Sequence, residues 1–189
     1  RQVQEGQVML TPQEEFWKGD FGDQYVDRCG GINWRARVPF WRSIMELTKP
    51  ESILEVGCNV GANMNAIREA TRDVWPLALW GVDINQAAIE EAGNAGHSVV
   101  QASLFDLKQE WPEDGFEFDL VATVGVLIHV APEDLGRAMD SIISVSNRYV
   151  LAVEYADEVE VEVDYRGHAQ RLWRRPFGRL YQERGLSMV

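Results

Sequence analysis

Two apolar segments, each ending in or next to a carboxylate, constrain the fold of this chain more than any other feature. Residues 53–56 (Ile-Leu-Glu-Val) lead through Gly57 and Gly61 into a segment with a helical pattern. Residues 79–83 form the second segment, which ends in Asp83, 22 positions after Gly61. This layout is typical of a crevice that binds a nucleoside at the carboxyl ends of two parallel strands. The sequence therefore predicts a bound cofactor that carries a ribose.

The turn after the first segment distinguishes two classes of cofactor. A dinucleotide turn carries glycine at its first and third positions and glycine or alanine at its sixth, whereas this chain has Gly57, Asn59 and Ala62. A side chain at the middle position hinders the close approach of a pyrophosphate. Glu55 would also repel a pyrophosphate, but it would attract an ammonium or a sulfonium. Since Asn59 tolerates positive φ, the turn favours S-adenosylmethionine.

These residues resemble the motifs of a known enzyme family. Glu55-x-Gly57-x-x-x-Gly61 is similar to the first motif of the class I S-adenosylmethionine-dependent methyltransferases, and Asp83 to the acid that ends their second strand. The resemblance covers about residues 50–155. It implies an α/β fold with a Rossmann-like, doubly wound, mostly parallel sheet, and S-adenosylhomocysteine as the product. It also implies these cofactor contacts: Glu55, Gly57, Asn59, Gly61, Asp83, Ile84, Ser103, Leu104 and Val124.

Two positions depart from the family pattern. Ser103 lies in the segment where the family contacts adenine, and many members carry an Asp there that binds the adenine amine. Asn59 stands where the wider superfamily often has a glycine.

Three further segments narrow the resemblance. They are residues 15–25 (Glu-Phe-Trp-x-Gly-x-Phe-Gly-x-x-Tyr), 125–130 (Gly-Val-Leu-Ile-His-Val) and 165–168 (Tyr-Arg-Gly-His). Together they resemble the methyltransferases associated with pseudaminic acid biosynthesis, which are encoded with bacterial nonulosonic sugar pathways. This resemblance implies a sugar or nucleotide-sugar acceptor. It also implies that the first segment covers the cofactor as a lid, with Trp17 and Tyr25 in contact with it. The alternative is that these aromatic residues only pack a helix on the sheet.

Two histidines are candidates for a general base. His129 is expected just beyond the fourth strand, where crevice ligands bind, and an ordinary histidine pKa suits proton removal at neutral pH. The alternative is that it caps the next helix or hydrogen-bonds locally. His168 is the second candidate, and its alternative is a surface turn. Glu154 and Tyr155 follow the fifth strand, and with Arg166 they are expected to bind the acceptor.

The chain is expected to form one domain in three parts: an N-terminal helical and lid segment (1–49), a cofactor-binding core (50–155) and a substrate-side segment (156–189). Hydrophobic spacing and capping residues predict helices and strands in alternation. The predicted helices span 12–17, 62–72, 86–95 and a segment from Pro132, and the predicted strands span 53–56, 77–82, 99–100, 120–123 and 149–153.

Several finer expectations can be checked against the structure. Gly19, Gly22, Gly30 and Gly31 predict irregular chain, and residues 159–163 alternate like an exposed strand. Phe40, Ile44 and Leu47 fall at helical spacing and predict a helix that packs before the first strand, and His97 is expected at the surface. Residues 186–189 would begin an antiparallel pair that nothing completes, which predicts a sheet truncated at its C-terminal edge.

Composition limits the partners of this chain. A formal net charge of −12 argues against a nucleic-acid substrate. No apolar run is long enough to span a membrane, and no leader is visible. Cys29 and Cys58 are therefore expected to be reduced in a cytoplasmic protein. The acids of residues 159–163 lack a neighbouring histidine, so no metal site is expected. Oligomeric state cannot be derived from the sequence.

Two other functions remain open at this point. A nicotinamide-dependent oxidoreductase would bind NADH through the same crevice. A non-catalytic module would bind S-adenosylmethionine or its product without turning over any acceptor.

Overall fold

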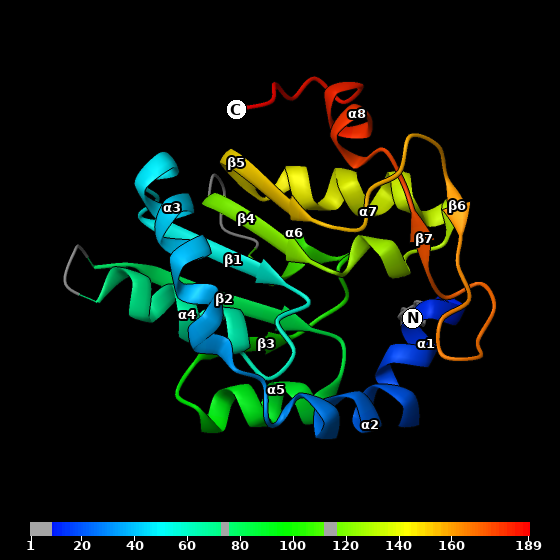
Figure 1. Ribbon diagram of the computed structural model, residues 1–189, viewed down its shortest axis with the longest axis horizontal. Coiled ribbons are helices and arrows are strands. Elements are labelled where there is room, and N and C mark those ends of the chain that lie inside the picture. Colours follow the sequence, from blue (N-terminus) through cyan, green and yellow to red (C-terminus); the bar gives the residue numbers. More distant parts are fainter. Residues whose placement is uncertain (1–8, 73–75, 112–116) are drawn as a thin grey trace, which may run out of the picture.

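The computed structural model describes residues 9–72, 76–111 and 117–189. Parallel strands form a sheet in the order β3-β2-β1-β4-β5, and Figure 1 shows helices on both of its faces. The strands are β1 (Ser52–Val56), β2 (Ala78–Asp83), β3 (Ser98–Gln101), β4 (Phe118–Val124) and β5 (Ser146–Val153). The predicted Rossmann-like, doubly wound α/β fold is confirmed.

The central strand β1 carries the first predicted motif. Ile53 and Leu54 are fully buried, because a parallel strand in the middle of a sheet packs against helices on both sides. Glu55 is only 1% exposed, and its partners on the two neighbouring strands are Gly81 and Ala122. The space beside Gly81 is filled by Cys58 and Met64, whose sulfur atoms would each lie 2.8 Å from a Cβ at that position.

Two hydrophobic clusters hold helices against the two faces of the sheet. Trp41 and Met45 of one helix and Met64 of another pack in one cluster, and Met139 packs in the other. The helices of the core are α3 (Val38–Thr48), α4 (Ala62–Thr71), α5 (Gln86–Asn94), α6 (Leu107–Glu110) and α7 (Pro132–Ser144).

Helices α1 (Pro12–Lys18) and α2 (Asp20–Cys29), here called the covering helices, precede this core. Thr11 and Glu14 form the capping box that was predicted for α1. The prediction of irregular chain at the glycines is wrong for Gly22, which lies inside α2. A Cβ at Gly22 would lie 1.8 Å from the carbonyl oxygen of Trp17. This glycine therefore serves close packing and does not break the helix.

The C-terminal part crosses from the β5 edge back to the covering helices (Figure 1). It contains β6 (Val161–Glu162), which pairs antiparallel with β7 (Trp173–Arg174), and then α8 (Phe177–Gln182). The strand predicted over residues 159–163 is reduced to two residues, since Val159 is exposed and unpaired in this ladder. Residues 186–189, expected to begin a further strand pair, form none.

The helix predicted before the first strand is confirmed as α3, although Phe40 and Leu47 point to solvent, with 43% and 60% exposure, because the buried residues of α3 are Val38, Trp41, Met45 and Thr48. The expectation for His97 is wrong. His97 is buried, not at the surface. Its ring occupies the space beside Gly61, and its Nε2 lies 3.2 Å from Oδ1 of Asn65.

Candidate active site

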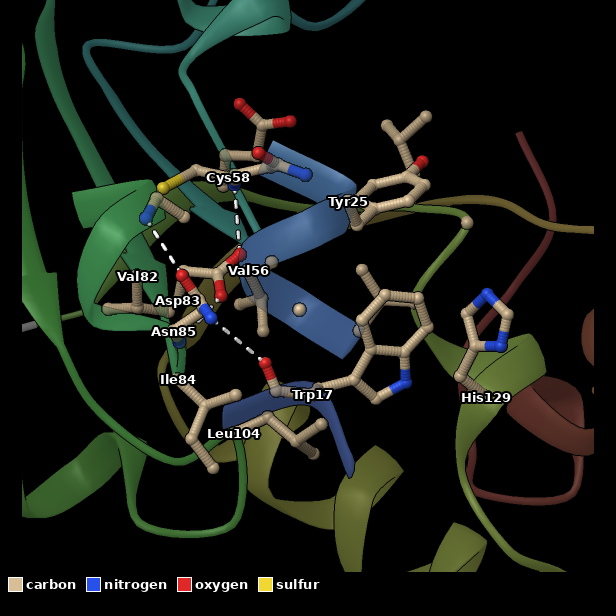
Figure 2. A pocket seen from close by; sticks show the side chains of 18 of the residues that line it. Trp17, Tyr25, Val56, Cys58, Val82, Asp83, Ile84, Asn85, Leu104 and His129 are labelled. Carbon is tan, nitrogen blue, oxygen red and sulfur yellow. Dashed lines mark hydrogen bonds between the residues drawn. The ribbon is translucent and has the colours of Figure 1, made fainter. Parts of the chain in front are cut away.

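A cavity lies at the carboxyl ends of the central strands, beneath the covering helices (Figure 2). It brings together most of the residues that the sequence predicts for the cofactor, from both the strand ends and the N-terminal segment. The predicted residues that line it are Trp17, Tyr25, Glu55, Gly57, Asn59, Asp83, Ile84, Leu104, Val124 and His129.

Glu55 presents a carboxylate oxygen that has no partner. Its Oε1 accepts a hydrogen bond from Nδ2 of Asn63 at 2.6 Å, whereas its Oε2 is buried without a partner among the described residues. Burial raises the pKa of Glu55 to about 8, although Asn63 and Arg37 oppose this shift. A buried carboxylate of this kind gains most from a ligand that brings a positive charge and a donor.

Asn63 links Glu55 to a cation in the same cavity. Its Oδ1 accepts from Nη1 of Arg37 at 2.7 Å and from Nε1 of Trp41 at 3.3 Å. Arg37 ends the 3-10 helix η1 (Trp34–Arg37) and lines the cavity. No sequence motif had pointed to Arg37 or Asn63. The side-chain amide of Asn63 therefore lies between the carboxyl group of Glu55 and the guanidinium of Arg37. A ligand with an α-amino acid group has an ammonium that suits the acid and a carboxylate that suits the guanidinium.

Asp83 lies at the end of β2 with both oxygens oriented by backbone. Its Oδ2 accepts from the amide of Asn59 and its Oδ1 from the amide of Asn85, each at 2.9 Å. Burial raises the pKa of Asp83, while these amides and that of Ile84 lower it. Because each carboxylate oxygen can accept two hydrogen bonds, Asp83 retains acceptor capacity toward the cavity.

The turn between β1 and α4 has the conformation that its residues suggest. Gly57 has φ 74°, and a Cβ there would lie 2.4 Å from Cγ2 of Val126. Asn59 has φ 47°, in the left-handed region expected for it. Gly61 (φ 77°) caps α4 and does not line the cavity.

His129 is the histidine that reaches the cavity. Its Nδ1 lies 2.6 Å from the carbonyl oxygen of Arg171, so Nδ1 carries the proton and donates, and Nε2 keeps a lone pair. Burial lowers the pKa of His129 to about 4, against the raising effect of this bond. The rings of Trp17 and Tyr165 each lie 4.7 Å from its ring. The imidazole is therefore neutral at neutral pH, with one nitrogen free to accept. Its pKa is lower than the ordinary value expected from the sequence, so His129 is a weaker base than an exposed histidine.

Two charged side chains hold the 3-10 helix η2 (Leu127–His129) in place. The first is Glu154, which accepts from the amides of Val126, Leu127 and Ile128 at 3.1–3.3 Å and does not line the cavity. Burial raises the pKa of Glu154, while these amides lower it.

Arg175 holds the same loop from its carbonyl side. It is fully buried and donates to the carbonyl oxygens of Leu127 and Val130 at 2.9 and 2.8 Å. Its Nε also donates to Glu160 at 2.7 Å. The C-terminal segment contains several arginines, and no sequence pattern distinguishes Arg175 from the others.

The covering helices are bonded to the strand ends by polar groups. Nδ2 of Asn85 donates to the carbonyl oxygen of Trp17 at 3.1 Å, drawn in Figure 2, and to Oδ1 of Asp23 at 2.8 Å. Trp17 and Tyr25 line the cavity, and Nε1 of Trp17 is buried without a partner among the described residues. Burial, Cys29 and Tyr165 raise the pKa of Tyr25 to about 12, so its hydroxyl stays protonated.

Four predicted site residues, besides Gly61 and Glu154, do not line the cavity. Tyr155 is 62% exposed. Arg166 and His168 lie in an exposed turn closed by Tyr165, and the His168 ring packs 5.1 Å from the ring of Phe16. Ser103 instead donates to Glu14, a lining residue that the sequence did not predict.

Other kinds of site find no support in the described part of the chain. Within it, no group of three or more His, Cys, Asp or Glu side chains is arranged to hold a metal ion. No helix in residues 9–72, 76–111 and 117–189 combines the length and the apolar character needed to cross a membrane.

Comparisons with known proteins agree with this geometry. Residues 34–189 match the sequence profile of a family described as "Methyltransferase domain". No match is found among curated protein sequences.

Solved structures share the fold at low sequence identity. The DhpI–SAH complex has a TM-score of 0.58 and 19% identity, over 92% of this chain and 84% of that one. The sugar N-methyltransferase KedS8 from Streptoalloteichus sp ATCC 53650 has a TM-score of 0.56 and 18% identity, over 88% and 68%. Magnesium protoporphyrin IX methyltransferase (ChlM) from Synechocystis PCC 6803 with bound SAM has a TM-score of 0.52 and 14% identity, over 88% and 97%.

Proposed function

The chain belongs to the methyltransferase domain family, and on this premise we propose that it transfers a methyl group from S-adenosylmethionine to a small acceptor, releasing S-adenosylhomocysteine. The observation that carries the proposal is the unpartnered, buried Oε2 of Glu55 at the end of the central strand. The cofactor offers an ammonium for this oxygen. A dinucleotide would place negative phosphates near the same turn.

The charge of the cavity supports a cationic ligand. Its described lining includes the carboxyl groups of Glu14, Glu55, Asp83 and Asp134, against a single guanidinium, that of Arg37. The acids that are ionised attract a sulfonium or an ammonium, and a cationic ligand in turn favours loss of the proton from Glu55, whose pKa burial raises to about 8.

The order of the strands determines which part of the cofactor would lie near which strand end. Glu55 at β1 and Arg37 on η1 suit the ammonium and carboxylate of an amino acid, and Asp83 at β2 suits the two ribose hydroxyls. Ile84 and Leu104 offer apolar contacts for a base beyond β2, on the side of β3. The opposite side, at β4, is left for the acceptor. The residues present therefore fit S-adenosylmethionine in one orientation.

The acceptor side contains the groups that this reaction needs. When bound, the cofactor supplies a methyl group that is already activated by the positive sulfur. Nε2 of His129 accepts a proton from an acceptor hydroxyl or ammonium, and Arg171 fixes the tautomer that makes this nitrogen available. Trp17 excludes water beside His129, and its free Nε1–H can donate to the acceptor.

The acceptor that best agrees with the sequence is a sugar or nucleotide-sugar intermediate of nonulosonic (pseudaminic) acid metabolism. The support is the resemblance of residues 15–25, 125–130 and 165–168, together with the presence of a sugar N-methyltransferase, KedS8, among the proteins that share the fold. A cytoplasmic location accords with the free thiols of Cys29 and Cys58.

Binding and turnover test the proposal separately. Calorimetric titration with S-adenosylmethionine, S-adenosylhomocysteine and NADH should give heat with the first two only, and binding of NADH alone would overturn the proposal. Methyl transfer to a panel of nucleotide sugars, followed by mass spectrometry, then identifies the acceptor.

The His129→Ala variant separates an enzyme from a non-catalytic binding module. It should keep its affinity for S-adenosylhomocysteine and lose about a hundredfold or more in turnover, the range typical of a missing general base. Unchanged turnover would remove His129 from the role of base.

A further inference from the structure

We propose that Glu14, on covering helix α1, accepts a hydrogen bond from the exocyclic amine of the adenine. This inference rests on the proposed function and deepens it, because it assigns the recognition of the base to a residue outside the nucleotide-binding core. The helix that closes the cavity would then also select the ligand.

Glu14 is a buried acid without a cation. It is 8% exposed and lines the cavity, and no Lys, Arg or His side chain of the described residues forms an ion pair with it. Its Oε2 accepts from the amide of Thr11 at 2.7 Å, and its Oε1 accepts from Oγ of Ser103. A buried carboxylate is stabilised by several donors, and each of these oxygens can accept one more.

The contact with Ser103 has a fixed direction. Oγ of Ser103 accepts from the amide of Phe105 at 3.1 Å, so its own proton is free to point at Glu14. The hydroxyl of Ser103 therefore donates to Glu14 and orients its carboxylate, and Glu14 is the residue that accepts from the ligand. Ser103, which the sequence predicts to contact adenine, therefore affects the adenine by positioning Glu14.

The position of Glu14 matches the base end of the ligand. Ser103 follows β3, the strand beyond β2, and its neighbours Ala102 and Leu104 line the cavity. A ligand with its amino acid at Glu55 on β1 and its ribose at Asp83 on β2 extends its base toward β3. Adenine carries one exocyclic amine, which is a donor, and the carboxylate oxygens of Glu14 can accept from it.

The test compares two ligands that differ at this amine. In S-inosylhomocysteine, a carbonyl oxygen replaces the exocyclic amine of S-adenosylhomocysteine and N1 carries a hydrogen. At the position of the amine, the ligand therefore places an acceptor opposite the Glu14 carboxylate, which is also an acceptor. Calorimetric titration of the wild-type protein should give at least about tenfold tighter binding of S-adenosylhomocysteine, since a polar site rejects a ligand that leaves it unpaired.

The variant Glu14→Gln should reverse the preference or abolish it. Glutamine at this position retains the capping box, with its oxygen accepting from the Thr11 amide. Its NH₂ group then faces the base and can donate to the oxygen of hypoxanthine. The ratio of the two affinities should fall to about one or below.

Two matched variants control for general effects. Glu15→Gln changes the exposed neighbour on the same helix, and Asp134→Asn changes another carboxyl group of the cavity lining. Both should keep the wild-type ratio. If Asp134→Asn abolishes the preference and Glu14→Gln keeps it, the inference is overturned in favour of Asp134.

The wild-type titration can overturn the inference even if Glu14→Gln does not fold. Equal affinity for the two ligands would overturn this inference and leave the proposed function intact. Failure to bind either ligand would overturn the proposed function, and this inference with it.

Discussion

The buried acid at the end of β1 couples folding to pH. Burial raises the pKa of Glu55 from 4.5 to about 8 in the folded protein, whereas the unfolded chain has the ordinary value. Between these two values the unfolded state loses the proton that the folded state keeps, so Glu55 makes the ligand-free protein less stable as pH rises through this window.

Replacement of Glu55 by Gln should therefore stabilise the ligand-free protein, and increasingly so at higher pH. The difference in melting temperature between Glu55→Gln and wild type should grow from about pH 5 to about pH 8. Differential scanning calorimetry across this range measures it. A difference that stays constant with pH would show that the carboxyl is already ionised in the folded state.

The same carboxyl should release a proton when the cofactor product binds. An ammonium beside Oε2 of Glu55 lowers its pKa, so binding near pH 7 expels the proton that burial had retained. Titrations with S-adenosylhomocysteine in buffers of different ionisation enthalpy count the released protons. Glu55→Gln should reduce this release to near zero and weaken binding.

At the scale of elements, Gly22 allows α2 to pack on α1. A Cβ there would meet the Trp17 carbonyl and Nδ2 of Asn85, so Gly22→Ala should displace the covering helices, despite the higher helix propensity of alanine. Affinity for S-adenosylhomocysteine should fall by about tenfold, and proteolysis within residues 9–30 should accelerate. Gly31→Ala is the matched control, because nothing lies within 4 Å of its Cβ position.

The loop that carries His129 depends on one buried arginine. Arg175→Met leaves the carbonyl groups of Leu127 and Val130 without donors and Glu160 without its ion pair. Denaturant unfolding should show a loss of about 3 kcal/mol. Arg174→Met, which removes only an exposed pair with Asp157, should change stability by less than about 1 kcal/mol. Equal losses in the two variants would contradict this account.

Helices and strands could be predicted from the sequence where a few neighbouring residues determine them. The strand over residues 53–56 and its turn were predicted because an apolar run and a left-handed Asn59 are both readable in a short window. Helix α2 was not predicted because glycine is unfavourable inside a helix. Gly22 instead allows close packing against Trp17 and Asn85, and Asn85 is 63 positions away in the sequence.

The site residues that could be predicted from the sequence are likewise those whose position depends on local signals. Glu55, Asp83 and His129 lie at or just beyond strand ends, so the parallel topology brings them to one edge. Glu14 and Arg37 reach the cavity from helices outside the core, and Arg175 reaches η2 from the C-terminal segment. Their placement depends on contacts between distant segments, for which a single sequence carries no signal.

For the whole molecule, ligand binding should appear as added stability. A ligand that binds only the folded state at about a hundred times its Kd adds about 2.7 kcal/mol. For a chain of 189 residues this corresponds to a rise of about 5–10 °C in melting temperature. Scanning calorimetry with S-adenosylhomocysteine should give this rise, and the same concentration of NADH should give none.

The order of the strands also bears on how such a protein changes over generations. The groups suited to the methyl donor lie near the ends of β1, β2 and β3 and on the helices before β1, whereas His129 lies beyond β4, next to the C-terminal segment 156–189. Mutations on that side can alter which molecule is methylated while the donor half stays intact. A lineage with this layout can acquire new acceptors one substitution at a time and never lose the ability to bind its methyl donor.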